Sequence, residues 1–409
     1  MQVEENDIAV ADGPLSGLRV LDIGTFIAAP FAATLMGEFG AEIYKIELPK
    51  IGDHARRLGT KSEAGDTFVW LSEARNKKSV CIDLRTPEGV ELFKSLVAVS
   101  DVVCENFQAG TLERWGLGWE ELSKVNPRII LLRISGYGQT GPYAKRPCFG
   151  RIANAFGGIS FLSGEQDRPP AQPGSATLAD YMAGLFGAFA VQMALRARDR
   201  TGKGQVIDIA LYEGIFRILD EVAPSYQKTG FVRRREGAET PLVVPHSHYP
   251  TSDGRWVAIA CTNDRIFARL TTDAMKRPEI ASSAAYATND ARIAHRTEVN
   301  GMVADWTSTM TRDEVLRRCA EAEVPCGPVY SIDEIFDDEQ YASRENILDF
   351  QDERVGSLAI PNVVPRLNGT PGKVKWLGPT LGSHTNEVLR DVLALDAEKI
   401  QRLKEKGIV

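Results

Sequence analysis

The chain has 409 residues, of which 43% are hydrophobic and 25% charged, and its formal net charge is -7 at pH 7. This length predicts about two domains with a large core, and the acidic balance argues against nucleic acid as a partner. Residues 1–14 form an acidic tail without the features of a signal peptide, and no uninterrupted apolar run reaches the roughly 18 residues of a membrane span. We therefore expect a cytoplasmic protein with no membrane partner.

Cysteine and histidine spacing gives little sign of a disulfide or a metal. The six cysteines form no CxxC pair, and several lie in strand-like apolar runs, so we expect reduced core thiols. His246 and His248 would share one face of a strand, but the sequence offers no third ligand beside them. We predict no metal site.

Residues 15–225 alternate between apolar runs and helical stretches. Residues 18–24 predict a buried strand, Pro30 opens a helix that ends near Phe39, and residues 41–47 predict a second strand. Further strands are expected at 79–84, 101–107, 128–135 and 205–211, and further helices at 87–99 with Thr86 as cap, near Glu120, and from Arg151. This alternation is typical of a parallel, doubly wound α/β sheet.

The segment Gly136-Tyr-Gly138-Gln-Thr-Gly141 has the glycine spacing of a dinucleotide-binding loop and follows a strand. In that motif the last glycine opens a helix that faces the pyrophosphate. Pro142 and Pro147 disfavour a regular helix here, and the expected acidic residue about 20 positions further on is missing. We therefore expect neither nicotinamide nor flavin binding.

Asp180 stands directly before the most apolar helical run of the chain, residues 181–191, which contains no charged residue. A helix that is apolar on all sides is expected to be buried. Because Asp is a preferred N-cap residue, Asp180 is predicted to cap this helix. From this pattern alone, the carboxylate can be a cap and nothing more.

Three regions follow the last expected strand of the sheet. Residues 226–244 are charged and contain glycine, as in a linker. Residues 245–325 predict a small α+β domain with a hairpin at 246–261 and an amphipathic helix at 310–323. Residues 326–409 are expected to return to the large domain and to end in a helix at 387–406.

Sequence blocks in a fixed order run along residues 15–409: GLRVLDIGTFIAAPFAATLMGEFGAEIYKIE, NKKSVCIDLRTPEG, VCENFQAGTLERWGLG, ISGYGQTGPYAKRP, LADYMAG, RTGKGQVIDIALYE, EVPCGPV and LGSHTNEVL. Together they resemble the class III CoA-transferase family of the CaiB/BaiF type, which includes the formyl-CoA and carnitine CoA-transferases. The resemblance implies a Rossmann-like large domain, a smaller α+β second domain, and an interlocked dimer in which two chains form linked rings.

The resemblance also implies that Asp180, within LADYMAG, matches the family's catalytic aspartate. An ionised carboxylate can attack a thioester carbonyl to form a mixed anhydride, and the released CoA thiolate can then form an aspartyl-CoA thioester. Because one thioester is exchanged for another, acyl-CoA is a substrate, and no metal or permanently bound cofactor is required. A buried position would keep water from the anhydride.

CoA contacts implied by the resemblance lie in several turns. By position they are Ile27, Ala28, Arg85, Asn106, Phe107 and Arg114. A guanidinium suits phosphate oxygens, and the backbone of a turn can approach a ligand closely. By residue type alone, the asparagine can equally be a cap, the phenylalanine a core residue, and both arginines surface charges.

The segment Phe149-Gly150-Arg151 departs from the resemblance, because many relatives carry an acidic residue after the aromatic one. Racemases of 2-methylacyl-CoA, which also resemble this family, need a histidine and an acid there, so a racemase is the weaker alternative. Ile27 replaces the glutamine of formyl-CoA transferases, and the second domain has no GGGG loop. The chain is therefore more similar to the carnitine type.

Arg151, next to Gly150, can bind the second carboxylate of a diacid such as succinate or malate, or it can lie on the surface. We expect CoA transfer from an acyl-CoA, with succinyl-CoA as a candidate, to a small di- or hydroxy-acid. A non-catalytic CoA-binding subunit of a heteromeric CoA-transferase is the other alternative. The expected partners are these substrates and a second chain, in a homodimer or in a heterodimer with a related subunit.

Overall fold

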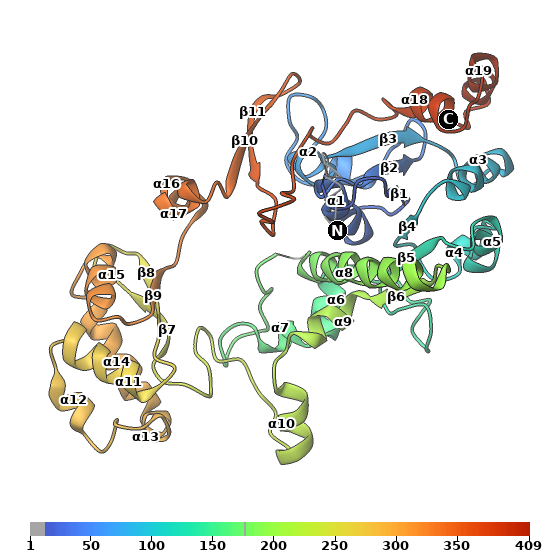
Figure 1. Ribbon diagram of the computed structural model, residues 1–409. Helices are drawn as coiled ribbons and strands as arrows, with labels where there is room; N and C mark the ends of the chain where they lie inside the picture. The colour runs from blue at the N-terminus through green and yellow to red at the C-terminus, as the bar shows by residue number, and fades with distance from the viewer. Residues whose placement is uncertain (1–12, 176) are drawn as a thin grey trace, which may run out of the picture. The chain divides into compact units, whose positions relative to one another are not determined.

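The structure, a computed structural model, describes residues 13–175 and 177–409, so most of the tail expected at 1–14 lies outside the described residues. It divides into two compact units. The larger unit comprises the described residues up to Ser160, Gln172–Gly230 and Ser343–Val409, and the smaller unit comprises Phe161–Ala171 and Phe231–Ala342. The larger unit holds a parallel sheet and the smaller one an antiparallel sheet (Figure 1).

A six-stranded parallel sheet forms the centre of the larger unit, in the order β3-β2-β1-β4-β5-β6. Its strands are β1 (Arg19–Asp22), β2 (Glu42–Glu47), β3 (Lys77–Cys81), β4 (Val102–Glu105), β5 (Ile130–Ser135) and β6 (Val206–Ala210). The order is that of a doubly wound Rossmann sheet, and it reverses between β1 and β4. The α/β prediction is confirmed, although each strand is shorter than the apolar run that predicted it.

Helices cover both faces of this sheet. One face packs against α1 (Ala28–Glu38), α6 (Gly150–Phe156), α8 (Leu178–Thr201) and α9 (Leu211–Arg217). The other packs against α3 (Pro87–Ala98), α4 (Thr111–Arg114), α5 (Trp119–Val125), α18 (Thr385–Asp391) and α19 (Ala397–Glu405). Because strand side chains alternate, Val20 enters the first core and Leu21 the second.

Thr86 caps α3 as predicted, since its side chain accepts a hydrogen bond from the Gly89 N–H. The prediction of a single helix at 387–406 is wrong, because this segment forms two helices, α18 and α19. The break has a local cause: the Asp396 side chain accepts a hydrogen bond from the Lys399 N–H at 2.7 Å and starts a new helix.

The larger unit is completed by η1 (His54–Arg57), α2 (Phe68–Glu73), α10 (Val222–Thr229) and the antiparallel pair β10 (Ile347–Asp352) and β11 (Gly356–Pro361). Helix α10 thus occupies the start of the region expected to be a linker from residue 226.

The smaller unit contains the hairpin predicted at 246–261, formed by β7 (His246–Pro250) and β8 (Trp256–Ala260). A third strand, β9 (Cys326–Pro328), pairs with β8, so these residues complete the small sheet where we expected the return segment to begin. Helix α15 (Arg312–Glu321) is the predicted amphipathic helix, capped by Thr311. The other helices are α11 (Asp264–Arg269), η2 (Leu270–Ala274), α12 (Pro278–Ser282), α13 (Asn289–Ala294), α14 (Arg296–Thr307) and α16 (Ile332–Asp337). Two short helices, α7 (Ile159–Leu162) and α17 (Glu339–Ser343), each cross a boundary between the units.

Helix α8 differs from its prediction in two respects. It begins at Leu178 after Thr177, so Asp180 lies inside the first turn and is not the N-cap. Leucine and alanine at 178 and 179 are good helix formers and extend the helix backwards past the aspartate. The helix is also not buried on all sides, because Leu185, Phe189 and Met193 on one face are 52%, 59% and 53% exposed.

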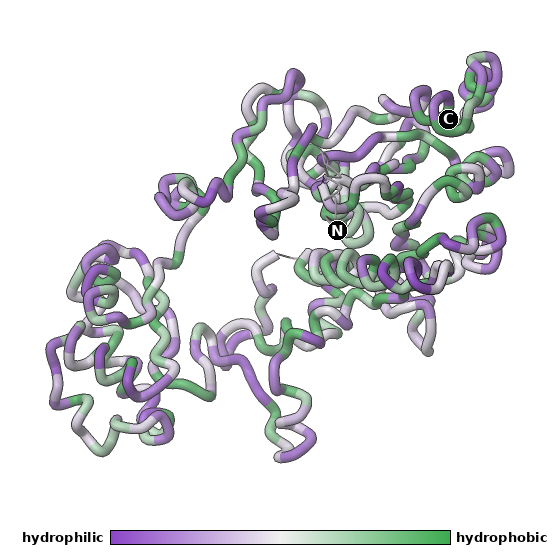
Figure 2. The backbone as a smooth tube through the Cα atoms, viewed as in Figure 1, coloured by the Kyte–Doolittle hydropathy of each residue, from purple (hydrophilic) through white to green (hydrophobic). Residues whose placement is uncertain are grey.

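By length and composition alone, α8 is long and apolar enough to cross a membrane, and it is the one such helix among the described residues. The sequence prediction did not identify it because the uncharged run extends only over residues 181–195, between Asp180 and Arg196. Hydrophobic residues follow most of α8, with hydrophilic ones toward its C-terminal end (Figure 2). Ala183, Gly184 and Gly187 on its other face are buried, as in the core helix of a globular unit.

Candidate active site

A cavity of about 190 Å³ lies at the carboxyl ends of β1, β2, β3 and β4. In open α/β sheets, the crevice at this edge, where the strand order reverses, is the usual ligand site. Its walls come from the segments that follow these strands, and include Gly24, Thr25, Asp53, His54, Arg85 and Phe107. Two of the residues predicted to contact CoA, Arg85 and Phe107, therefore lie in the wall.

Asn106 joins two of these segments. Its Oδ1 accepts a hydrogen bond from the Thr25 N–H and its Nδ2 donates to the Thr25 carbonyl, both at 2.7 Å. The side chain is thus a bridge across the reversal of strand order and not a helix cap. The neighbouring Phe107 ring contacts the Trp115 ring with centroids 5.1 Å apart, and Trp115 also lines the cavity.

The two predicted arginines differ in their placement. The Arg85 side chain is 60% exposed at the cavity, and its Nε and Nη2 atoms donate to the two carboxylate oxygens of Asp83 at 2.8 and 2.7 Å. Arg114 lies in α4, where Nη2 donates to Thr111 Oγ1 at 2.9 Å. It is not in the cavity wall, although the next residue, Trp115, is.

Ile27 and Ala28 lie where the first turn becomes helix α1. Ile27 is the N-cap, Ala28 is the first helical residue, and both are buried. The preceding residue, Phe26, has a φ of 61°, a left-handed conformation that is unfavourable for a residue with a Cβ. The N–H groups at the start of a helix have no partner within that helix, so this turn can present free donors.

Helix α8 brings Asp180 close to the start of α1. A Cβ built on Gly184, one turn after Asp180, would lie 2.6 Å from the Ala28 carbonyl oxygen, so only glycine permits this approach. The Tyr181 ring packs edge-on against Phe31 of α1, with centroids 4.8 Å apart. Burial raises the pKa of Asp180 to about 6. The structure therefore places the partly buried Asp180 on the turn of α8 that precedes its contact with the Ile27–Ala28 turn.

Residues that neighbour one another lead from Asp180 toward the cavity. The thiol of Cys148 has a raised pKa, first because of burial and second because of the nearby negative charge of Asp180. The next residue, Phe149, contacts the Phe26 ring edge-on with centroids 6.0 Å apart. Phe26 in turn stacks on His54 at 5.3 Å, and His54 lines the cavity.

Gly150 is the first residue of α6 and is buried, whereas Arg151 is exposed. Within the described residues, no ion pair holds the Arg151 guanidinium. The preceding glycine-rich segment, Gly136–Gly141, is an irregular bend followed by turns at 142–145, and the next helix starts only at Gly150. The prediction that this segment does not open a helix is confirmed.

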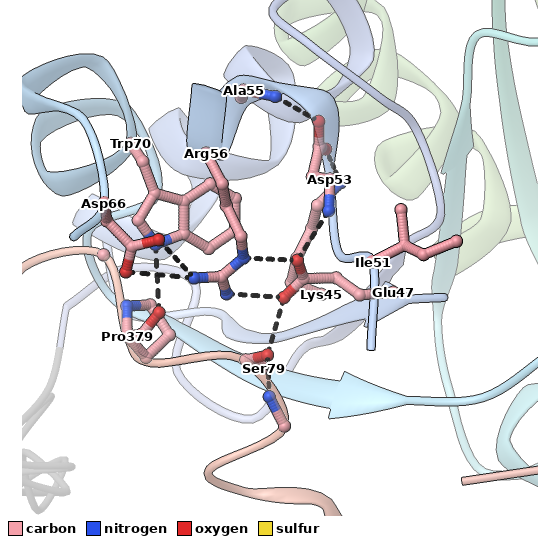
Figure 3. Close-up of polar contacts among 12 residues, drawn as sticks. Lys45, Glu47, Ile51, Asp53, Ala55, Arg56, Asp66, Trp70, Ser79 and Pro379 are labelled. Carbon is pink, nitrogen blue, oxygen red and sulfur yellow. Dashed lines mark hydrogen bonds and ion pairs between the residues drawn. The ribbon is translucent and has the colours of Figure 1, made fainter. Parts of the chain in front are cut away.

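Sequence reasoning missed a buried network of charges in and behind the wall of the cavity (Figure 3). Both carboxylate oxygens of Glu47 accept from Arg56, at 2.8 Å each, and Oε1 also accepts from Ser79 Oγ at 2.6 Å. Lys45 Nζ lies 2.8 Å from Asp53 Oδ2. The sequence contains a sign of this network, because the charged residues Lys45 and Glu47 belong to the segment 41–47, which predicted a buried strand.

All six cysteines are free; Cys81, Cys104, Cys261 and Cys319 are buried, whereas Cys148 and Cys326 are only partly buried. Among residues 13–175 and 177–409, no group of three or more histidine, cysteine or acidic side chains is arranged to hold a metal ion.

Comparison with known proteins identifies the family. Residues 15–385 match the model of CoA-transferase family III. The alpha and beta subunits of succinyl-CoA–L-malate CoA-transferase from Chloroflexus aurantiacus are 53% and 52% identical to this chain, over 97% of it in each case and over 92% and 98% of their own lengths. A solved CAIB/BAIF family protein from Brucella suis has a TM-score of 0.82 and 34% identity, covering 93% of this chain and 100% of its own. Because these matches extend over nearly the whole length, the chain belongs to CoA-transferase family III and is a CoA-transferase.

Proposed function

We propose that the protein transfers CoA from succinyl-CoA to a small dicarboxylic or hydroxy acid. The observation that carries this proposal is the similarity to two subunits that are both named for succinyl-CoA and L-malate, at 53% and 52% identity. Malate is both a dicarboxylic and a hydroxy acid, so it falls within the proposed acceptor class. The six free cysteines are in keeping with a cytoplasmic location.

The proposed reaction is covalent catalysis by Asp180. A carboxylate oxygen attacks the thioester carbonyl and the C–S bond breaks, which leaves a mixed anhydride and a CoA thiolate. The thiolate attacks the aspartyl carbonyl of the anhydride, so that the donor acid leaves and an aspartyl-CoA thioester remains. The acceptor carboxylate then attacks this thioester, and the returning thiolate captures the acceptor acyl group and frees Asp180. No metal or permanently bound cofactor takes part.

The surroundings of Asp180 support this role. Burial disfavours its charged form, and a pKa of about 6 leaves the carboxylate ionised at neutral pH but less stabilised than one in water. Its place in the first turn of a 24-residue helix gives some electrostatic compensation through the helix dipole. A partly dehydrated carboxylate is the better nucleophile, and a dry site protects the anhydride from hydrolysis.

We further propose that CoA binds across the reversal of strand order. Arg85 has an exposed guanidinium at the cavity, which suits a phosphate group. Phe107 lines the same cavity, and Asn106 holds the adjoining turn. Ile27 and Ala28 would face the thioester with their backbone, while Arg114 would act from the neighbouring helix α4.

For the acceptor acid, we propose that Arg151 pairs with the second carboxylate of a diacid. Its guanidinium is exposed and follows Phe149, whose ring contacts Phe26 beside the cavity. Gly150, which lies between Phe149 and Arg151 in the chain, has no side chain. A guanidinium can hold a carboxylate through two parallel hydrogen bonds, which favours diacids over monoacids.

Trapping with hydroxylamine tests the covalent mechanism. Wild-type protein is incubated with succinyl-CoA and hydroxylamine, and peptides are analysed by mass spectrometry. The expected product is a hydroxamate on the peptide that contains Asp180, together with loss of activity. Asp180→Asn and wild-type protein without succinyl-CoA are the controls. If the wild-type peptide keeps its mass while CoA transfer proceeds, the mechanism is wrong.

A second candidate is a subunit that depends on a related chain. It is favoured by the similarity of this chain to both an alpha and a beta subunit. The exposed apolar face of α8, formed by Leu185, Phe189 and Met193, is a suitable surface for another copy or for a related subunit, including in an interlocked dimer. Trapping on the purified chain alone distinguishes the two candidates: a hydroxamate supports a chain that is catalytic without a related subunit, and no hydroxamate supports a subunit without its own catalysis.

A further inference from the structure

A buried ion pair stands directly behind the first turn of the cavity. Lys45 Nζ lies 2.8 Å from Asp53 Oδ2, and both side chains are 1% exposed. Lys45 also lies 3.4 Å from Asp22 Oδ1 and donates to the Gly24 carbonyl. Burying such a pair has a large desolvation cost, which requires compensating contacts.

The other oxygen of Asp53 holds the turn itself. Asp53 Oδ1 accepts hydrogen bonds from the Phe26 N–H at 2.9 Å and from the Ala55 N–H at 2.8 Å. Phe26 is the residue with a φ of 61°. Because Ile27 and Ala28 follow it directly, the direction of the first N–H groups of α1 depends on this conformation.

Asp53 is itself held from several sides. Its backbone N–H donates to Glu47 Oε2 at 2.8 Å, and the same oxygen accepts from Arg56 (Figure 3). Burial alone would raise the pKa of Asp53, but Lys45 and the N–H groups of Ala55 and Phe26 bring it below its usual value. The oxygen that faces Phe26 is therefore charged at neutral pH, and hydrogen bonds to a charged acceptor are roughly twice as strong as neutral ones.

The same end of α1 has a second anchor. Lys77 Nζ donates to the Pro30 carbonyl at 2.7 Å and lies 2.9 Å from Asp22 Oδ2. Asp22 Oδ1 in turn accepts from the Gly24 N–H at 3.1 Å. Lysine and aspartate side chains from β1, β2 and β3 thus fix the turn on both sides of Phe26.

We propose that Asp53 is a positioning residue for CoA transfer: it holds Phe26 in its left-handed conformation so that the N–H groups at the start of α1 face the thioester oxygen. This inference rests on the proposed attack by Asp180, whose helix contacts the Ala28 carbonyl. Donors that are already oriented are most effective where negative charge develops in the transition state. Asp53 should therefore affect the rate of the reaction more than the binding of CoA.

The test is Asp53→Asn, which keeps the shape and an acceptor oxygen but removes the ion pair. Glu38→Gln is the matched control, because Glu38 is a buried carboxylate 2.6 Å from Arg75 at the other end of α1. The assay follows the exchange of labelled succinate into succinyl-CoA, and calorimetry measures the affinity for free CoA. In Asp53→Asn we expect kcat to fall at least about tenfold, with the Kd for CoA changed less than about threefold. Glu38→Gln should keep both values. An unchanged kcat in Asp53→Asn, or equal effects on kcat and on CoA affinity, would overturn the proposal.

A double-mutant cycle distinguishes positioning from a general structural role. Phe26→Gly removes the Cβ that makes the left-handed conformation unfavourable. The effect of Asp53→Asn on kcat should be smaller in the Phe26→Gly background than in the wild type. Equal effects in both backgrounds would contradict the proposed role.

If Asp53→Asn does not fold, hydrogen exchange of the wild-type protein gives the answer. The Phe26 amide should exchange slowly because Asp53 accepts its hydrogen, and fast exchange at Phe26 would overturn the proposal. The hydroxylamine experiment tests the proposed function separately from the role of Asp53. If the proposed function is wrong, the wild-type protein gives no hydroxamate at Asp180.

Discussion

Asn106 and Thr25 are joined by two hydrogen bonds at the point where the strand order reverses. Asn106 Oδ1 accepts from the Thr25 N–H, and Nδ2 donates to the Thr25 carbonyl, both at 2.7 Å. One side chain therefore fixes the spacing of the turns that follow β1 and β4. The cavity at the carboxyl ends of the strands depends on this spacing.

Asn106→Leu should remove both bonds while roughly keeping the volume of the side chain. We expect the free energy of unfolding to fall by about 1–3 kcal/mol and the KM for acyl-CoA to rise about tenfold. Asn126→Leu is the control, since Asn126 Nδ2 donates to the Val97 and Ser100 carbonyls at the opposite edge of the sheet. It should lose comparable stability, measured by denaturant unfolding, with an unchanged KM. The same rise in KM for both variants would argue against a role of Asn106 in the site.

The pKa of Asp180 predicts a pH dependence of the reaction. The carboxylate must be ionised to attack, and burial raises its pKa to about 6. We expect kcat/KM to be constant above about pH 7 and to fall about tenfold per pH unit well below pH 6. Initial rates between about pH 5 and pH 8 test this. A flat profile across that range would contradict the role of Asp180 as the free carboxylate nucleophile.

The same pKa has a consequence for stability. In the unfolded chain the pKa of an aspartate is about 3.9, so between about pH 4 and pH 6 the folded state binds more protons and loses stability as the pH rises. Asp180→Asn removes this loss and should be more stable than the wild type by about 1–3 kcal/mol at pH 8. The difference should shrink toward about pH 4.5. Denaturant unfolding at both pH values measures it, and a variant that is less stable than the wild type at pH 8 would contradict the burial of an ionised Asp180.

Arg151→Ala should change the choice of acceptor acid. If the guanidinium pairs with the distal carboxylate, the KM for diacids should rise at least about tenfold, while poor monoacid acceptors stay the same. Arg200→Ala, at the exposed end of α8, is the control for the loss of a surface arginine. A panel of acids with succinyl-CoA as donor, followed by mass spectrometry of the acyl-CoA products, measures the effect. An unchanged diacid KM would show that Arg151 is only a surface residue.

The exposed apolar face of α8 predicts association with another chain. Phe189→Glu places a charge in the centre of this face, which burial against a partner would penalise. We expect the variant to shift toward monomer in light scattering. Val99→Glu changes an exposed apolar residue at the end of α3, on the other face of the sheet, and should leave the molar mass unchanged. A Phe189→Glu variant with the wild-type molar mass would exclude this face as the interface.

Much of the larger unit could be predicted because strands β1 to β5 are largely buried and therefore rich in apolar residues. The edge strand β6, which contains the exposed Asp208, was found from its remaining apolar residues. Thr86 marked the start of α3 through its capping hydrogen bond. Element boundaries were less accurate. Asp180 was predicted to be an N-cap and Asp396 was overlooked as one, because the choice of capping residue depends on where the chain turns.

The sequence by itself determined the α/β alternation, the family and the candidate carboxylate Asp180, since these depend on local composition and on ordered blocks of residues. Only the tertiary structure decided that Lys45 and Asp53 meet behind Phe26, because the parallel pairing of β1 and β2 brings the segment after β2 against the turn after β1. It also decided which side of α8 stays exposed. Hydropathy predicts that an apolar face needs a partner, but packing determines which face finds one within the same chain.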